Sequence, residues 1–240
     1  TIRIGTKSLS FWPYRYLTDK DSGKILELFR KITDSGTHLS IMAHINHHRE
    51  MNTDAFREAV KRIRQTGAVV RSQSPVLNHV NADAAVWEKM WVDQVRMGII
   101  PYYMFVPRNT GAHRYFSIPL VKAYDIYREA FSRVSGLART VRGPSMSAHQ
   151  GKVKIDGTPE INGKKIISMS FIQARSPDWV KKPFFAEYDE KACWMNELKP
   201  AFGDKAFFFD RDRSGLMGLD DCDDYMDLAS AGMALSESLA

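Results

Sequence analysis

The alternation of apolar and amphipathic segments constrains the fold of this chain more than any other feature of its sequence. Short apolar runs that predict buried strands recur near residues 1–5, 39–45, 68–72 and 100–106, with a weaker one near 137–142. Stretches with helical periodicity separate these runs. Strands and helices in such alternation are typical of a parallel sheet or barrel covered by helices. We therefore predict an α/β fold.

The predicted helices share a stop signal. Glycine, the residue that most readily ends a helix, follows them shortly before the next strand. We expect helices at about Asp21–Ser35, from Asn52 or Thr53 to Gly67, at about Asp83–Met97, and from Pro119 to just before Gly136.

From Gly143 onward the sequence changes to glycine, proline and β-forming residues. Residues 151–157 and 165–171 predict two strands of a small antiparallel β appendage. Asn162-Gly163 is the residue pair that a type I′ hairpin turn prefers. The chain therefore changes from a parallel to an antiparallel pattern near this point.

This change suggests three parts. We expect a β/α part at 1–142, a β-rich appendage at 143–215, with a last buried strand at Phe207-Phe208-Phe209, and an acidic, mobile tail at 216–240. The tail contains six acidic residues and no Lys or Arg.

Composition and charge limit the classes of partner. The 240 residues are 44% hydrophobic, which is enough for one substantial core. No apolar run approaches the roughly 18 residues of a membrane helix, and there is no secretory signal, so we expect a cytoplasmic protein without a membrane partner. The net charge of +6 could indicate nucleic-acid binding. Basic residues such as Arg57 and Lys61 are instead spread over predicted helix faces, which favours no nucleic acid, although the surplus would suit an anionic substrate or a cofactor phosphate.

Two polar blocks, residues 44–50 and 72–81, follow directly after predicted strands. A β/α barrel carries its chemistry at this end of its strands, so both blocks predict an active-site rim. His44, Asn46 and His47 could ligate a metal, donate hydrogen bonds to a bound ligand, or form a purely structural loop.

The second block leaves similar alternatives. Gln73 and Ser74 are short polar groups that could fix the edge of a ligand, or they could simply form a turn. Asn81 could bind a ligand or cap the helix that follows it.

Four segments, in order, resemble the signatures of the lysine 2,3-aminomutase family. Residues 2–7 (I-R-I-G-T-K) resemble R-I-G-T-R, and residues 44–50 resemble H-F-N-H-P-x-E. Residues 72–81 resemble N-Q-S-V-L-L-x-G-V-N, and residues 101–105 resemble the last part of R-P-Y-Y-x-Y. Members of this family are radical S-adenosylmethionine enzymes that also use pyridoxal phosphate. The resemblance implies that this chain is the C-terminal part of a partial β/α barrel of the radical S-adenosylmethionine type, followed by a small β-rich appendage.

The resemblance also implies an iron–sulfur cluster whose ligands lie outside this chain. The family holds a 4Fe-4S cluster with C-x3-C-x2-C, whereas this chain has only Cys193 and Cys222, 29 residues apart. That spacing favours neither a disulfide framework nor a zinc site. We expect the cluster cysteines before Thr1 and the chain to be the C-terminal part of a longer enzyme.

Site residues follow from the same comparison. His44, Asn46 and His47 would line the S-adenosylmethionine pocket, and His48 stands where the family has Pro. The cofactor-binding residues that we expect in these two blocks are His44, Asn46, His47, Gln73, Ser74 and Asn81.

Lys152 resembles the lysine that forms the Schiff base with pyridoxal phosphate in the family segment G-G-G-G-K-x-P. That role needs a neutral amine, which burial and nearby positive charge favour. Here the residues before Gly151 are not glycines and no Pro follows. The alternative is a lysine that keeps an edge strand soluble, as neighbouring Lys154 could.

Arg108 and Arg142 stand where the lysine-binding members of the family have aspartates. Because buried guanidinium groups would repel a substrate ammonium and bind a carboxylate, we expect a substrate other than lysine. Solvation of Arg108 at the surface is the alternative.

The leading hypothesis is a radical S-adenosylmethionine aminomutase that moves an amino group between adjacent carbons of a small amino acid. A second is an enzyme of the same family without pyridoxal chemistry, and a third is a non-catalytic barrel fragment that binds a partner. A homo-oligomer is compatible with each of them.

Overall fold

The computed structural model describes residues 1–108 and 110–211. Residues 1–201 form one compact unit, and residues from Phe202 onward belong to a second. The first unit is built on one nine-stranded sheet in which the strands follow the order β1-β2-β3-β4-β5-β6-β8-β7, with β9 paired to β8.

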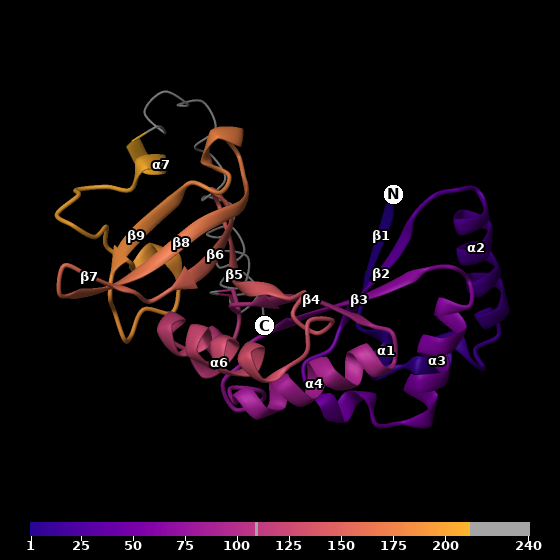
Figure 1. The fold of residues 1–240 in the computed structure, drawn as a ribbon. Coiled ribbons are helices and arrows are strands. Elements are labelled where there is room, and N and C mark those ends of the chain that lie inside the picture. The colour runs from indigo at the N-terminus through magenta and orange to yellow at the C-terminus, as the bar shows by residue number, and fades with distance from the viewer. Residues whose placement is uncertain (109, 212–240) are drawn as a thin grey trace, which may run out of the picture. The chain divides into compact units, whose positions relative to one another are not determined.

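The first five strands of the sheet are parallel and alternate with helices along the chain (Figure 1). The strands are β1 (Ile2–Thr6), β2 (Leu39–His44), β3 (Val69–Pro75), β4 (Ile100–Phe105) and β5 (Arg142–Ala148). The helices between them are α2 (Ser22–Asp34), α3 (Asp54–Arg64), α4 (Ala84–Arg96) and α6 (Leu120–Arg133). Shorter helices are α1 (Ser8–Phe11), α5 (His113–Phe116) and the 3-10 turns η1 (Pro13–Tyr16), η2 (His48–Met51), η3 (Pro177–Trp179) and η4 (Met195–Glu197).

Antiparallel strands continue the same sheet beyond β5. They are β6 (Gly151–Gly157), β7 (Glu160–Ile161), β8 (Lys164–Ala174) and β9 (Pro183–Glu187). Asn162 and Gly163 link β7 to β8 with φ angles of 51° and 73°. Positive φ at both positions is the signature of the predicted type I′ turn, which is therefore confirmed.

The hydrophobic core lies between the parallel strands and the helices. Alternate residues of β2, Leu39, Ile41 and Ala43, are fully buried in it. Since side chains alternate across a strand, the residues between them face the opposite side of the sheet. Helices α2, α3, α4 and α6 lie along one side of the parallel strands in Figure 1, so the other side is the helix-free face.

Helix boundaries agree with the predicted signals. The Thr53 side chain accepts a hydrogen bond from the Phe56 amide and caps α3, while Asp83 caps α4 in the same way. Gly67 and Gly98 follow α3 and α4 with φ angles of 84° and 72°. This is the left-handed conformation that ends a helix.

Parts of the fold prediction need correction. The α/β class is confirmed, but the sheet is open, because its end strand β1 pairs only with β2 among the described residues. The barrel is therefore not confirmed. The weak strand expected at 137–142 begins only at Arg142, because a turn fills Gly136–Thr140.

The predicted strand at Phe207-Phe208-Phe209 is also wrong. In the second unit, Phe208–Arg211 form the short helix α7, and the ring of Phe207, just before the helix, stacks on that of Phe209 with centroids 5.1 Å apart. The acidic tail at 216–240 lies outside the described residues. The domain boundary expected at residue 142 stays a prediction, since strand pairing passes through it without a break.

Helices of the length and apolar character needed to cross a membrane are absent from the part of the chain that the structure describes.

Candidate functional site

A row of side chains crosses the helix-free face of the parallel strands. His44 on β2 is in register with Gln73 on β3, Gln73 with Tyr103 on β4, and Tyr103 with Arg142 on β5. Residues in register on neighbouring strands point to the same face. The sheet thus brings together three predicted site residues, His44, Gln73 and Arg142, and adds Tyr103 between them.

His44 is largely removed from solvent at the end of β2. Burial lowers the pKa of its imidazole, and the positive charge of Lys7 lowers it further, against the opposing effects of Asn46 and Glu50. The buried atoms His44 Nε2 and Asn46 Oδ1 have no partner of good hydrogen-bond geometry among the described residues, although the Asn46 side chain is close enough to the imidazole to act on its pKa. Buried polar atoms are rarely left unpaired, so these two are suited to contact a ligand.

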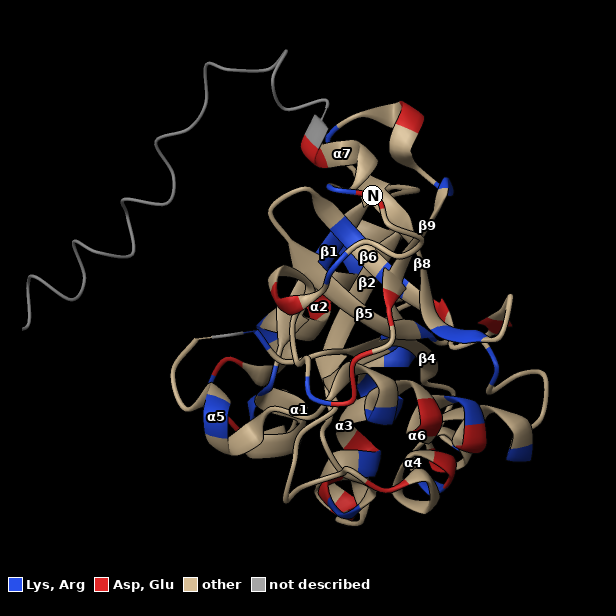
Figure 2. Cartoon of the chain, turned by 90° about the vertical axis from the view of Figure 1, so that its left-hand side faces the viewer, with Lys and Arg blue, Asp and Glu red and all other residues tan. Residues whose placement is uncertain are grey.

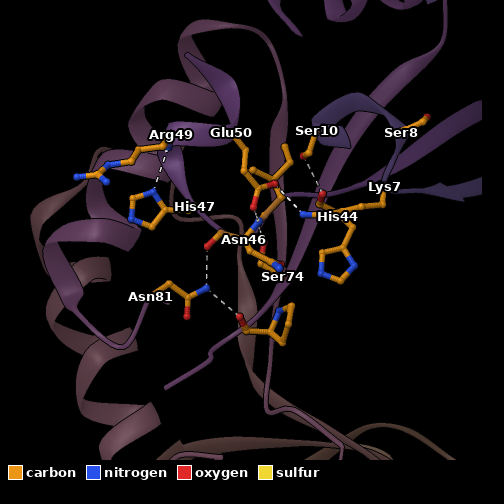
Figure 3. A network of polar contacts seen from close by, with 12 residues as sticks. Lys7, Ser8, Ser10, His44, Asn46, His47, Arg49, Glu50, Ser74 and Asn81 are labelled. Carbon is orange, nitrogen blue, oxygen red and sulfur yellow. Dashed lines mark hydrogen bonds and ion pairs between the residues drawn. The ribbon is translucent and has the colours of Figure 1, made fainter. Parts of the chain in front are cut away.

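The Glu50 carboxylate fixes the loop that carries these groups (Figure 3). Its Oε2 accepts a hydrogen bond from Lys7 Nζ at 2.7 Å, and its Oε1 accepts one from the backbone N–H of Asn46 at 3.1 Å. Lys7 follows β1 and Asn46 follows β2, so one carboxylate joins two strand ends. Both of its oxygens are engaged, which argues against the metal-ligand alternative for this block.

His47 and His48 have separate surroundings, although their ring centroids are 4.3 Å apart. His47 Nδ1 accepts a hydrogen bond from the Arg49 amide at 3.1 Å and caps η2. The charges of Lys89 and Asp93 on α4 act on His48, which places its ring near that helix. His47 therefore has a clear structural role, and its contact with a cofactor stays a prediction.

Ser74 and Asn81 are held by backbone groups. Ser74 is buried, and its hydroxyl donates to the Ile45 carbonyl. The Asn81 amide donates to the Asn46 and Pro75 carbonyls at 2.7 and 3.0 Å. The capping alternative for Asn81 is wrong, because Asp83 caps α4. Both side chains support the loops after β2 and β3, and direct ligand binding by either stays a prediction.

Lys152 on β6 reaches over aromatic rings of β4. Its Nζ lies 4.3 Å from the centroid of the Tyr103 ring and 5.2 Å from that of Phe105, and these two rings are stacked. Burial lowers the pKa of the Lys152 ammonium, and the charges of Arg3, Arg142 and Arg108 act in the same direction. A lysine in these surroundings gives up its proton more readily than an exposed one.

Arg142 and Arg108 are both exposed and belong to the same neighbourhood. Arg142 Nη1 donates to the Tyr103 hydroxyl at 3.4 Å, and the Arg142 guanidinium also lies over the Tyr102 ring. Arg108 is close enough for its charge to affect Lys152. The structure therefore gathers the predicted residues Lys152, Arg142 and Arg108 at one place.

Comparison with known proteins gives this arrangement a context. A protein of Aquifex aeolicus (strain VF5) named "Putative L-lysine 2,3-aminomutase" is 32% identical over 197 residues, which are 82% of this chain and 50% of that protein. The L-lysine 2,3-aminomutase of Escherichia coli (strain K12) is 29% identical over 124 residues, or 50% of this chain and 35% of that one. The chain belongs to the lysine 2,3-aminomutase family.

The chain is also similar to a relative whose name gives glutamate, and not lysine, as the substrate. The glutamate 2,3-aminomutase of Clostridioides difficile (strain 630) is 23% identical over 137 residues, which are 57% of this chain and 30% of that enzyme. The chain spans half or less of the length of these three relatives. No protein-family model matches it.

The aminomutase-family chain shows no metal centre among its described residues. No group of three or more His, Cys, Asp or Glu side chains there is arranged to hold an ion. Cys193 is a free thiol whose Sγ contacts the Lys191 carbonyl at 3.3 Å. Cys222 lies outside the described residues. The two cysteines cannot supply the three clustered thiolates that the family's iron–sulfur cluster needs.

Sequence reasoning missed several members of this candidate site. Tyr103 and Phe105 were expected only as part of a strand, and Arg3 and Arg71 were not singled out. A usable signal was present, because an arginine between buried positions of a strand must face the side opposite to the core.

Proposed function

We propose that the protein of which this chain is part is a radical S-adenosylmethionine aminomutase acting on an amino acid other than lysine. The observation that carries the proposal is the position of Lys152. A half-buried amine lies over the Tyr103 ring, on the same face as the row that ends at His44.

The residues around Lys152 fit pyridoxal phosphate. When bound, this cofactor serves as an electron sink for substrate amines. Lys152 would hold its aldehyde carbon, since burial and neighbouring arginines favour the neutral amine. The Tyr103 and Phe105 rings would pack against the flat pyridine ring. Arg142 and Arg108 supply positive charge for anionic groups.

The residues at the end of β2 fit a polar ligand such as S-adenosylmethionine. His44 Nε2 and Asn46 Oδ1 are buried and have no partner of good hydrogen-bond geometry within the described chain. A donor and an acceptor side by side suit a ligand that has both carboxylate and hydroxyl groups. Gln73, next to His44 in the row, offers a second amide. The two cysteines of this chain do not fit an iron–sulfur cluster, which needs three clustered thiolates.

The expected substrate follows from charge. Arg108 and Arg142 would repel the distal ammonium of lysine, whereas a guanidinium binds a carboxylate with two parallel hydrogen bonds. One matched relative is named a glutamate 2,3-aminomutase. We propose a substrate with an anionic or neutral polar group distal to the reacting amine, glutamate being the simplest.

The test of the cofactor site is covalent capture. Pyridoxal phosphate is added to the chain, borohydride fixes the bound cofactor, and peptide mass spectrometry finds the modified lysine. We expect modification at Lys152 and its loss in Lys152→Ala. Lys154→Ala is the matched control, because Lys154 lies on the same strand but pairs with Asp156 at 2.7 Å.

Two outcomes would redirect the proposal. Modification at Lys154 or Lys165 in place of Lys152 would move the cofactor site. No modification at all would favour the second hypothesis, a family member without pyridoxal chemistry. The absence of the G-G-G-G-K-x-P pattern from this sequence supports that hypothesis as well.

A further inference from the structure

A tyrosine between two arginines lies beside the proposed cofactor site. The Tyr102 ring has the Arg71 guanidinium carbon 5.2 Å from its centroid and that of Arg142 at 5.1 Å. Arg71 belongs to β3 and Arg142 to β5, so the two neighbours of β4 each contribute one guanidinium to the same ring. Cation–π contacts of this kind hold a guanidinium in place while leaving its N–H donors free.

A bulge in β4 explains how Tyr102 and Tyr103 both come to this face. Ser72 is in register with Pro101 and Gln73 with Tyr103, so Tyr102 is an extra residue without a partner on β3. A bulge lets two consecutive residues point to the same side of a sheet. Tyr102 and Tyr103 do so, because their rings are 4.5 Å apart and Arg142 lies over both.

The charges on this face are not balanced. Strands β1 to β5 contain Arg3, Arg71 and Arg142 but no Asp or Glu. No ion pair is formed by these arginines or by Lys152 within the described chain. Figure 2 shows basic segments beside β1 and β6, whereas helices α3, α4 and α6 carry both acidic and basic segments. Like charges gathered without a counter-charge favour the binding of an anion.

We infer that Arg71 and Arg142, both stacked on Tyr102, form a site for one oxyanion group, a carboxylate or a phosphate. Each guanidinium presents N–H donors in the planar arrangement that binds two oxygens of such a group. Arg71 was not among the residues expected to bind substrate, and it adds a second fixed cation to Arg142. That the bound carboxylate is the distal group of a substrate rests on the proposed function. The anion site itself does not rest on it.

The experiment is a calorimetric titration of the 240-residue chain with two probes at low salt. Glutarate represents a dicarboxylic substrate without its amine, and inorganic phosphate represents the cofactor phosphate. We expect saturable binding of at least one probe. Arg71→Gln should weaken it about tenfold, the effect of losing one charge-assisted contact. Tighter binding of glutarate would assign the site to substrate, and tighter binding of phosphate would assign it to the cofactor.

Controls separate charge from folding. Arg71→Lys keeps the charge and should retain more affinity than Arg71→Gln. Arg57→Gln removes an arginine from α3, where it pairs with Asp54 at 3.1 Å, and should bind both probes like the unmodified chain. The circular dichroism spectrum of each variant, recorded at the temperature of the titration, checks that the variant folds.

Two results would overturn the inference. One is the absence of saturable binding of both probes, and the other is equal binding by the unmodified and Arg71→Gln chains. If either of these results is found while pyridoxal phosphate becomes attached to Lys152 in the unmodified chain, the proposed function stands and the anion site is wrong. If pyridoxal phosphate does not become attached to Lys152 in the unmodified chain although the probes bind, the anion site stands and the proposed cofactor site is wrong.

Discussion

His44 shows how one buried side chain makes stability depend on pH. Its pKa is lower in the folded chain than the ordinary value of 6.5, chiefly because of burial. The unfolded chain therefore binds a proton more readily, and the free energy of unfolding should fall as pH decreases below about 6.5. Urea unfolding at several pH values between 5 and 8 measures this. The slope should become smaller in His44→Gln, and an unchanged slope would show that other groups control it.

Glu50 is the second residue with a predicted effect. Replacing it by Gln leaves the half-buried Lys7 without its counter-charge, so we expect a loss of about 1–2 kcal/mol in the free energy of unfolding. Glu27→Gln is the matched control, because Glu27 pairs with Lys31 on the exposed face of α2 and should cost less than about 0.5 kcal/mol. Equal losses in the two variants would contradict a special role for Glu50.

Arg108 tests substrate choice at the same scale. An active enzyme that contains this chain should prefer glutamate to lysine by roughly a hundredfold or more, since an unpaired buried ammonium is costly. Arg108→Asp should reduce this preference. Turnover of glutamate, alanine and lysine by both forms is the measurement, and a preference for lysine in the unmodified enzyme would contradict the role of this loop.

At the scale of elements, Gly151 limits the β5–β6 hairpin that presents Lys152. Its φ is 148°, and a Cβ there would lie 2.2 Å from the Gln173 carbonyl oxygen on β8. Gly151→Ala should therefore destabilise the chain by about 2 kcal/mol or more. Gly136→Ala, where a Cβ would meet no atom within 4 Å, should change stability little. Chemical unfolding compares the two, and equal midpoints would show that the hairpin adapts freely.

The parallel strands and their helices could be predicted because local signals agree with the final packing there. Thr53 and Asp83 act as caps, and the glycines after α3 and α4 adopt the expected φ. Phe207-Phe208-Phe209 misled the prediction, because a short apolar run fits a buried strand or one helical turn equally well. Strand β9 was not expected, since its pairing with β8 depends on contacts distant in sequence.

The site could be predicted only in part for the same reason. His44, Gln73, Arg142 and Lys152 were found from their positions near strand ends or from family resemblance. The position of Arg71 between two buried strand residues indicates its face, but its contact with Tyr102 became visible only through the register of three strands and the bulge. A bulge depends on pairing between strands, and no local sequence pattern in β4 predicts it.

For the whole molecule, the cysteine content leads to a further prediction. The 240-residue chain has two cysteines, so anaerobic reconstitution should not yield a stoichiometric iron–sulfur cluster, and the chain alone should not cleave S-adenosylmethionine. Iron analysis and an assay for 5′-deoxyadenosine are the measurements. A stoichiometric cluster with turnover would mean that other groups in the chain serve as ligands.

The single extra residue in β4 suggests how members of such a family could diverge. Ile100 is in register with Arg71, so regular alternation from Ile100 would keep Tyr102 on this face and would turn Tyr103, whose ring lies against Lys152, to the core side. A one-codon insertion or deletion in this strand would then change which aromatic ring supports the arginines and the lysine while leaving every one of these charged residues in place. Substrate preference could thus be inherited or lost through strand length, a kind of change that comparison of aligned site residues alone would overlook.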